Sequence, residues 1–223
     1  MNAHDPLLAR NWKKTKVLQC HNASERLALV CFLRERYAER FFEPIACLTG
    51  APSSGQGYGF AIMSLCCLLI ETIECYRLGW PSSSAKELRD LQNDPLNSKV
   101  PESHYKLSGS FQNEKFSSEV AFKKFFEEPK HKEYFPDVDG AVFYTAIRCG
   151  LLHQAQTKGS WLILTSGKQW DDAPSQKSIN RNCFSQALKA CFDAFLEELE
   201  RAAWVEDPWK NAGKKIWWLA QTS

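Results

Sequence analysis

Apolar positions recur with helical spacing over the first third of the chain. Between residues 24 and 49, apolar side chains such as Leu33 and Phe41 alternate with charged ones at the period of an α-helix. Ser24 is the expected N-cap of this amphipathic helix. We expect the helix to end before Pro44 or near Thr49, since proline cannot donate an intrahelical hydrogen bond.

A second helix is predicted over residues 60–78, which are apolar on almost every side. Glu71 and Glu74 belong to a narrow polar stripe, the pattern of a helix packed between others. The longest apolar run, residues 58–70, is too short to span a bilayer. We therefore expect the central helix of a bundle and no contact with a membrane.

Two segments are predicted to be loops. Residues 50–59 are rich in glycine but lack the Gly-Lys-Ser/Thr ending of a phosphate-binding loop and follow a helix, so we interpret them as a flexible connection. Residues 81–118 contain three prolines and few apolar positions. They are expected to form a polar insertion with one short helix at 85–91.

The segment 119–155 is predicted to carry two helices. The first covers residues 119–128, and the second begins after Asp139 as N-cap and ends close to His153. The core-facing positions of the second helix are Val142, Phe143, Ala146, Ile147 and Leu151. Residues 161–165 are short and β-prone, and we expect them to form a small β-hairpin.

The last long helix is predicted at residues 182–204, where apolar residues make one continuous stripe. A tail rich in Trp and Lys follows at 205–223. These elements predict an all-α fold, a bundle of four to six helices in a single domain of residues 1–223. Its parts are a first helical pair (24–80), the polar insertion (81–118), the segment 119–155, the last long helix and the tail.

Composition is that of a soluble globular protein. Hydrophobic residues make up 44% of the 223 positions and charged residues 24%, which excludes wholesale disorder. The net charge of +2 implies that any contact with RNA comes from a local patch and is sensitive to salt. The N-terminus lacks the pattern of a signal peptide, so we expect a cytoplasmic protein.

The nine cysteines show no spacing typical of a zinc site, and we expect no metal and no cofactor. Several lie within apolar helical runs and are expected to be reduced thiols of the core: Cys31, Cys66, Cys67, Cys75, Cys183 and Cys191. Four histidines have no partner motif and are interpreted as surface residues: His4, His21, His104 and His131.

The residues with the clearest chemical potential are Arg148 and His153. A guanidinium stays charged and binds phosphate oxygens through two parallel donors, while an imidazole can accept or donate a proton near neutral pH. On a regular helix the two positions differ by about 140°. They can act together if the helix frays at Gly150 or if two subunits share the site.

The segment 144–161, YTAIRCGLLHQAQTKGSW, resembles the Arg-x4-6-His signature of the HEPN superfamily. The resemblance implies a small helical bundle, commonly dimeric, and a metal-independent endoribonuclease of toxin–antitoxin or other defence systems. It implies catalytic roles for Arg148 and His153 in a composite site of a homodimer. Three further residues are candidates outside the signature: Glu71 and Cys149 could support the pair and Lys158 could contact RNA, while the alternatives are a solvated stripe, a packed thiol and a loop lysine without a role.

Two other functions remain open. Many active members of the superfamily have a polar residue after the arginine, and Cys149 at this position favours a non-catalytic helical module that binds a nucleotide or a partner protein. A third interpretation is an accessory subunit of a defence complex, with the tryptophan-rich tail as an exposed apolar patch. For a nuclease, the expected partners are RNA, a second copy of the chain and a cognate antitoxin or defence protein.

Overall fold

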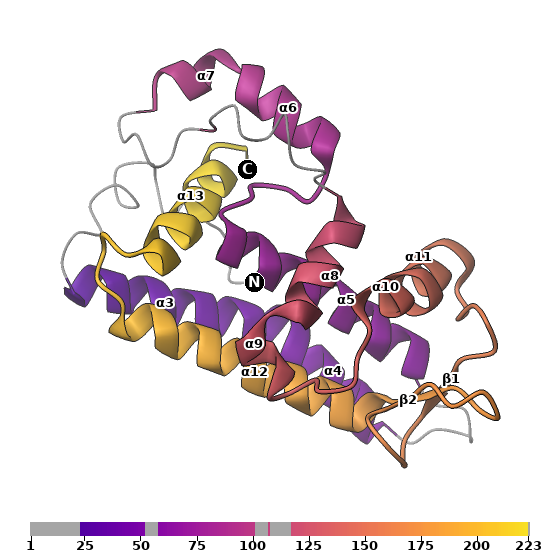
Figure 1. The fold of residues 1–223 in the computed structure, drawn as a ribbon. Helices are drawn as coiled ribbons and strands as arrows, with labels where there is room; N and C mark the ends of the chain where they lie inside the picture. The colour runs from indigo at the N-terminus through magenta and orange to yellow at the C-terminus, as the bar shows by residue number, and fades with distance from the viewer. Residues whose placement is uncertain (1–22, 52–57, 101–106, 108–116, 223) are drawn as a thin grey trace. The chain divides into compact units, whose positions relative to one another are not determined.

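The computed structural model describes residues 23–51, 58–100, 107 and 117–222 (Figure 1). Of these residues 70% are helical and 5% lie in strands, so the fold is mainly helical, as predicted. The chain divides into two compact units. The first unit comprises Met1–Arg36, Ile73–Ser118 and Leu196–Ser223, and the second comprises Tyr37–Thr72 and Glu119–Phe195. Most of the predicted connection at 50–59, and residues 101–106 and 108–116 of the predicted insertion, lie outside the described residues.

The first long helix runs through Pro44. It consists of α3 (Ala23–Tyr37), a π-helical segment η1 (Ala38–Phe42) and α4 (Glu43–Gly50). In the π segment the Glu43 N–H donates to the Ala38 carbonyl, five residues back. Because proline lacks an N–H and crowds the preceding turn, a wider turn just before Pro44 accommodates it. The helix therefore ends near Thr49, and the alternative ending before Pro44 is wrong, as is the N-cap at Ser24, which lies inside α3.

The core of the first unit includes the C-terminal helix α13 (Asp207–Thr222). Its tryptophans Trp209, Trp217 and Trp218 are buried, and the Trp209 indole N–H donates to the Leu199 carbonyl at 2.6 Å. The Lys215 ammonium is buried too and donates to the Pro81 carbonyl. The interpretation of residues 205–223 as an exposed apolar patch is therefore wrong, because these indoles close a core.

Two short helices precede the undescribed part of the insertion. α6 (Ala85–Asn93) confirms the short helix predicted there, and the Ser84 hydroxyl caps it by accepting from the Glu87 N–H at 3.3 Å. α7 (Pro95–Ser98) follows at once and is capped by Asp94.

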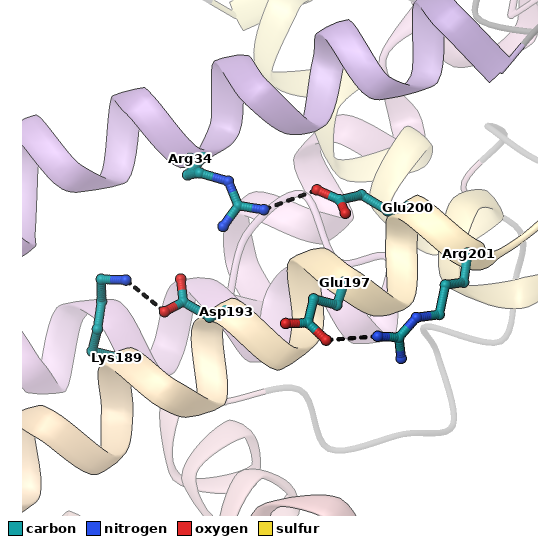
Figure 2. Close-up of polar contacts among 6 residues, drawn as sticks. All are labelled: Arg34, Lys189, Asp193, Glu197, Glu200 and Arg201. Atoms are coloured by element: carbon teal, nitrogen blue, oxygen red, sulfur yellow. Dashed lines mark hydrogen bonds and ion pairs between the residues drawn. The ribbon is translucent and has the colours of Figure 1, made fainter.

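The polar face of α12 (Arg181–Arg201) carries a series of ion pairs (Figure 2). Lys189 pairs with Asp193 and Arg201 with Glu197, each one helical turn apart. In the first unit, Arg34 of α3 donates to Glu200 of α12 at 2.8 Å, with 43% and 34% of the two side chains exposed. Exposed pairs of this kind contribute at most about 1 kcal/mol each, so they mark a solvated face. α12 confirms the predicted last long helix, although it ends three residues early.

The helix α5 (Gly59–Leu78) confirms the predicted central helix. Glu74 is only 1% exposed and pairs with Arg77 at 2.9 Å, so it does not lie on a solvated stripe. At 20 residues the helix is long and apolar enough to cross a membrane, contrary to the expectation from residues 58–70. However, 61% of its most apolar window is buried inside the protein, which is also the property of a core helix.

The second unit has an aromatic core beneath the helix that carries Arg148. It involves α8 (Ser118–Glu127), the short α9 (Pro129–Lys132) and α12. Phe143 stacks on Phe184 with ring centroids 5.2 Å apart. His131 belongs to this core: it is 4% exposed, and its Nδ1 lies 2.8 Å from the Phe125 carbonyl oxygen. The interpretation of His131 as a surface residue is wrong, because the turn after Pro129 folds it back onto α8.

A small mixed sheet replaces the predicted hairpin. Strand β1 (Leu162–Leu164) pairs in parallel with β3 (Ser178–Asn180), and β2 (Trp170–Asp171) pairs antiparallel with the other edge of β3. The order is β1-β3-β2. The Asn180 side chain donates to the Gly167 carbonyl at 3.0 Å, which ties the turn after β1 to the strand lying between β1 and β2.

The eight described cysteines are free thiols. Four of the predicted core thiols are buried, namely Cys66, Cys67, Cys75 and Cys191, whereas Cys31 and Cys183 are exposed. Cys31 lies two positions from both Leu29 and Leu33, which are buried. Because two positions turn a helix by about 200°, Cys31 faces away from the core.

Candidate functional site

The helix that carries the candidate residues is built from three consecutive segments of the second unit. They are α10 (Gly140–Val142), the π-helical η4 (Phe143–Arg148) and α11 (Cys149–Gln154). Asp139 caps its start, since its Oδ1 accepts from Ala141 N at 2.8 Å and Val142 N at 2.9 Å. Both the N-cap and the end near His153 confirm the sequence prediction. The π turn ends at Arg148, and such turns are frequent at functional sites.

The chain folds back tightly after this helix. Ala155 adopts the left-handed conformation with φ 52°, and its N–H donates to the Leu151 carbonyl at 3.1 Å. The Lys158 N–H then donates to the Ala146 carbonyl at 2.8 Å. A Cβ on Gly150 would overlap the Gln156 carbonyl oxygen and lie 3.1 Å from Lys158 N. Only glycine at position 150 allows the returning chain to pass this close.

Arg148 is held by its neighbours in the second unit. Its Nη2 lies 3.5 Å from Oε2 of Glu71 on α5, and the two side chains are 16% and 15% exposed. The guanidinium carbon also lies 5.5 Å from the centroid of the Tyr144 ring, within the range of a cation–π contact. The positive charge is therefore oriented from two sides and largely shielded from bulk water.

Two groups near Arg148 remain protonated at neutral pH. Burial raises the pKa of Tyr144, and a hydrogen bond shared with the Cys149 side chain raises this pKa further, while Arg148 opposes the shift. Burial also raises the pKa of the Cys67 thiol well above 9.0; Cys66 adds to the shift and Arg148 again opposes it. Neither Tyr144 nor Cys67 is therefore available as an anionic nucleophile near pH 7.

His153 stands apart from this cluster. Its side chain is exposed, and in the described part of the chain it forms no hydrogen bond or ion pair. α11 is regular from Cys149 to Gln154, so Arg148 and His153 lie about 140° apart around its axis. Fraying at Gly150, one of the two ways in which the residues could meet, does not occur.

The predicted site residues thus fall into two groups. Arg148 and Glu71 meet, with half-buried Cys149 beside them, whereas exposed His153 and half-buried Lys158 do not join them. Sequence reasoning missed Tyr144 and Cys67. Tyr144 lies four residues before Arg148, the spacing at which helical side chains meet, and this signal was available. Over the residues with described positions, no group of three or more His, Cys, Asp or Glu side chains could hold a metal ion.

A separate apolar groove lies in the same unit. It has a volume of about 780 Å³ and lies between η1, α4 and the N-terminal half of α12. Phe42, Ile45 and Ala46 line one side, and Asn182 and Lys189 the other. The ammonium of Lys189 lies 5.3 Å from the centre of the Phe42 ring. Grooves of this size with few polar groups suit small ligands.

The second unit therefore presents a shielded arginine–glutamate pair and, at the end of the same helix, a solvated imidazole. These features define a candidate site by geometry. Comparisons of the chain with protein-family models, with curated proteins and with solved structures give no match.

Proposed function

We propose that the protein is a metal-independent endoribonuclease with a bundle of HEPN type. It would cleave single-stranded RNA and leave 2′,3′-cyclic phosphate and 5′-OH ends. The observation that carries the proposal concerns the helix that bears both residues. The His153 imidazole is exposed at its end, and Arg148 on the same helix is oriented by contacts with Glu71 of α5 and with Tyr144. The reaction requires a base, an acid and a fixed cation, and an imidazole can act as either the base or the acid.

The reaction requires two subunits. One imidazole must take the proton of the 2′-OH as its oxygen attacks phosphorus, and another must give a proton to the departing 5′-oxygen. Each chain offers one histidine in the motif, and a two-fold dimer that apposes the two helices would supply both. Leu152, beside His153, is 38% exposed and offers apolar area for such a contact.

Arg148 would offset the negative charge that develops on the phosphorane oxygens. A preorganised cation of this kind lowers the activation free energy by a few kcal/mol, provided that it does not have to reorient during the reaction. Glu71 would act as a positioning residue through its 3.5 Å contact with the guanidinium. Cys149 would support the arrangement through its hydrogen bond with Tyr144, and Lys158 would contact a phosphate outside the reacting one.

The proposed setting is a cytoplasmic toxin or defence effector with a cognate antitoxin or another defence protein as partner. The net charge of +2 supports RNA binding through a local patch and predicts strong salt dependence.

The test is incubation of purified protein with single-stranded RNA in EDTA. Wild type and the matched control Gln154→Ala, an exposed neighbour of His153, should cleave the RNA, and His153→Ala should not. Sedimentation velocity on the same samples should find a dimer in each. Equal loss of cleavage in His153→Ala and Gln154→Ala would assign the effect to the helix end and not to the imidazole.

A non-catalytic binding module is the second candidate. The observation in its favour is that Arg148 already contacts Glu71 and Tyr144, so its charge is partly satisfied without RNA. The volume of the groove between α4 and α12 lies within the range of small-ligand pockets. Stabilisation by a nucleotide in a thermal-shift series, with intact RNA in the cleavage assay, would favour this candidate.

A further inference from the structure

Arg181, the first residue of α12, is a buried cation of the second unit. Its side chain is 6% exposed, and its Nε is enclosed without a hydrogen-bond acceptor. Among the residues with described positions, no carboxylate pairs with it. Other arginines have such partners, as Arg77 pairs with Glu74 and Arg148 with Glu71.

A buried charge without a partner is costly. Removing a guanidinium from water costs several kcal/mol unless an opposite charge and hydrogen bonds replace the lost hydration. Arginine cannot avoid this cost by losing its proton, since it stays charged at any working pH. An anion close to Arg181 would replace part of the hydration that its enclosed Nε has lost.

The guanidinium of Arg181 points at the beginning of α5. Its Nη1 lies 3.3 Å from the place that a Cβ on Gly59 would occupy, and the Ile163 side chain also lies close to that place. Gly59 is the first residue of a helix of 20 residues. A Cβ at position 59 would meet Ile163 Cγ2 at 2.8 Å, so the glycine is what lets the guanidinium lie directly against the first residue of α5.

The start of α5 is itself electropositive. Ile62 N–H donates to the Tyr58 carbonyl at 2.9 Å, and it is the first residue of the helix that can reach a carbonyl one turn back. The N–H groups of the preceding residues point out of the helix end, where the macrodipole adds about half a positive charge. Two positive features this close repel each other, and an anion in contact with both would relieve the repulsion.

We propose that Arg181 and the first turn of α5 bind a tetrahedral oxyanion of the phosphate class. The backbone N–H groups would donate to some of its oxygens and the guanidinium to others, the arrangement that phosphate favours. The N-terminus of α12 does not compete, because the Asn180 side chain already accepts from Asn182 N and Cys183 N.

This anion site is separate from the Arg148 pair. Glu71 lies twelve residues after Gly59 on α5, which corresponds to about 18 Å along a helix. The inference therefore stands or falls independently of the proposed nuclease, and it accommodates either a free phosphate or the phosphate of a nucleotide.

The test is calorimetric titration of the full chain with inorganic phosphate at constant ionic strength, with chloride as the competing anion. Wild type should bind phosphate saturably. Arg181→Met should lose roughly 10- to 100-fold in affinity, since it removes charge-assisted hydrogen bonds. The control Arg201→Met, which removes an exposed arginine at the other end of the same helix, should bind as wild type does.

Two further arms make the test decisive. Without phosphate, Arg181→Met should be at least as stable to urea as wild type, because it removes an unpaired buried charge. A ribonucleoside 5′-monophosphate that binds more tightly than inorganic phosphate identifies a nucleotide as the ligand, and equal binding identifies free phosphate. Absence of saturable phosphate binding to wild type, or equal binding by wild type and Arg181→Met, would overturn the inference.

Discussion

Nη2 of Arg148 and Oε2 of Glu71 lie 3.5 Å apart, although 77 positions separate the two residues in the sequence. The contact joins the helix that carries the motif to the central helix α5. It fixes the direction of a charge that would otherwise rotate freely on a long side chain. The proposed nuclease depends on this fixed direction, since electrostatic stabilisation is effective only when the cation is already in place.

Glu71→Gln should therefore slow RNA cleavage and leave the fold intact. We expect kcat to fall about 10-fold with an unchanged KM, because a misplaced group near the reaction costs rate and not affinity. The free energy of unfolding should fall by roughly 1–3 kcal/mol, because the guanidinium is largely shielded from water and loses its counter-charge. Steady-state kinetics and urea denaturation measure the two effects. Glu197→Gln, which breaks the exposed pair with Arg201, is the control, and unchanged cleavage in Glu71→Gln would remove Glu71 from the site.

Gly150→Ala should destabilise the protein. The added methyl group would overlap the Gln156 carbonyl oxygen, and backbone atoms cannot move aside as a flexible side chain can. We expect a loss of roughly 1–3 kcal/mol in the free energy of unfolding. The matched control is Gly50→Ala, where nothing lies within 4 Å of the added Cβ and the residue is helical; this change should be neutral or stabilising. Equal effects of the two substitutions in urea denaturation would contradict the close approach at Gly150.

Ala155→Gly should stabilise the protein. Ala155 has φ 52°, and the left-handed conformation costs an L-residue with a Cβ roughly 1–2 kcal/mol. Part of this gain is lost because glycine has more freedom when unfolded, so we expect a net gain of about 0.5–1 kcal/mol. Thermal denaturation measures the change. A lower midpoint in Ala155→Gly than in wild type would show that the methyl group contributes packing that outweighs the backbone strain.

Stability should fall at alkaline pH because of a buried thiol in α5. Burial raises the pKa of Cys66 from 9.0 to about 12. A group whose pKa is raised on folding contributes full stability below its unfolded pKa, and this contribution is lost as the pH rises from 9.0 toward 12. The expected slope is at most about 1.4 kcal/mol per pH unit for one thiol. Urea denaturation between pH 7 and 10.5 should show a flatter dependence in Cys66→Ala than in wild type, and parallel curves would contradict the assignment.

The helices were the part of the fold that the sequence could predict. α8, the helix from Gly140 to Gln154 and α12 each carry one apolar stripe, and Asp139 supplies a side-chain cap that its position already indicated. These are local properties, decided within a few turns of helix. Pro44 is an exception to prediction from local pattern. A proline normally ends a helix, but here a π turn accommodates it, and no residue pattern predicts that turn.

Long-range properties were not predictable in the same way. β1 pairs with β3 and not with β2, which is nearer in the sequence, and the Asn180 side chain of β3 donates to the Gly167 carbonyl in the turn after β1. The burial of His131 follows from a turn that brings it against Phe125. Both outcomes depend on contacts that form only when the chain folds. The periodicity of apolar residues, two for a strand and 3.6 for a helix, does not predict such contacts.

The candidate site divides along the same line. Arg148 and His153 could be selected from spacing and chemistry, and Glu71 from its place in the polar stripe of the central helix. Tyr144 and Cys67 come close to Arg148 only in the folded unit. Arg181 could not be selected from the sequence, because its burial beside Gly59 is a property of the fold.

The central claim is that His153 and Arg148 of two chains break a phosphodiester without a metal. The most direct measurement is to map both ends of the RNA fragments that the wild-type protein releases in EDTA. We predict 2′,3′-cyclic phosphate and 5′-OH ends that are absent with His153→Ala and with Arg148→Ala. Fragments with 3′-OH and 5′-phosphate ends, or RNA left intact by the wild-type dimer, would contradict the account.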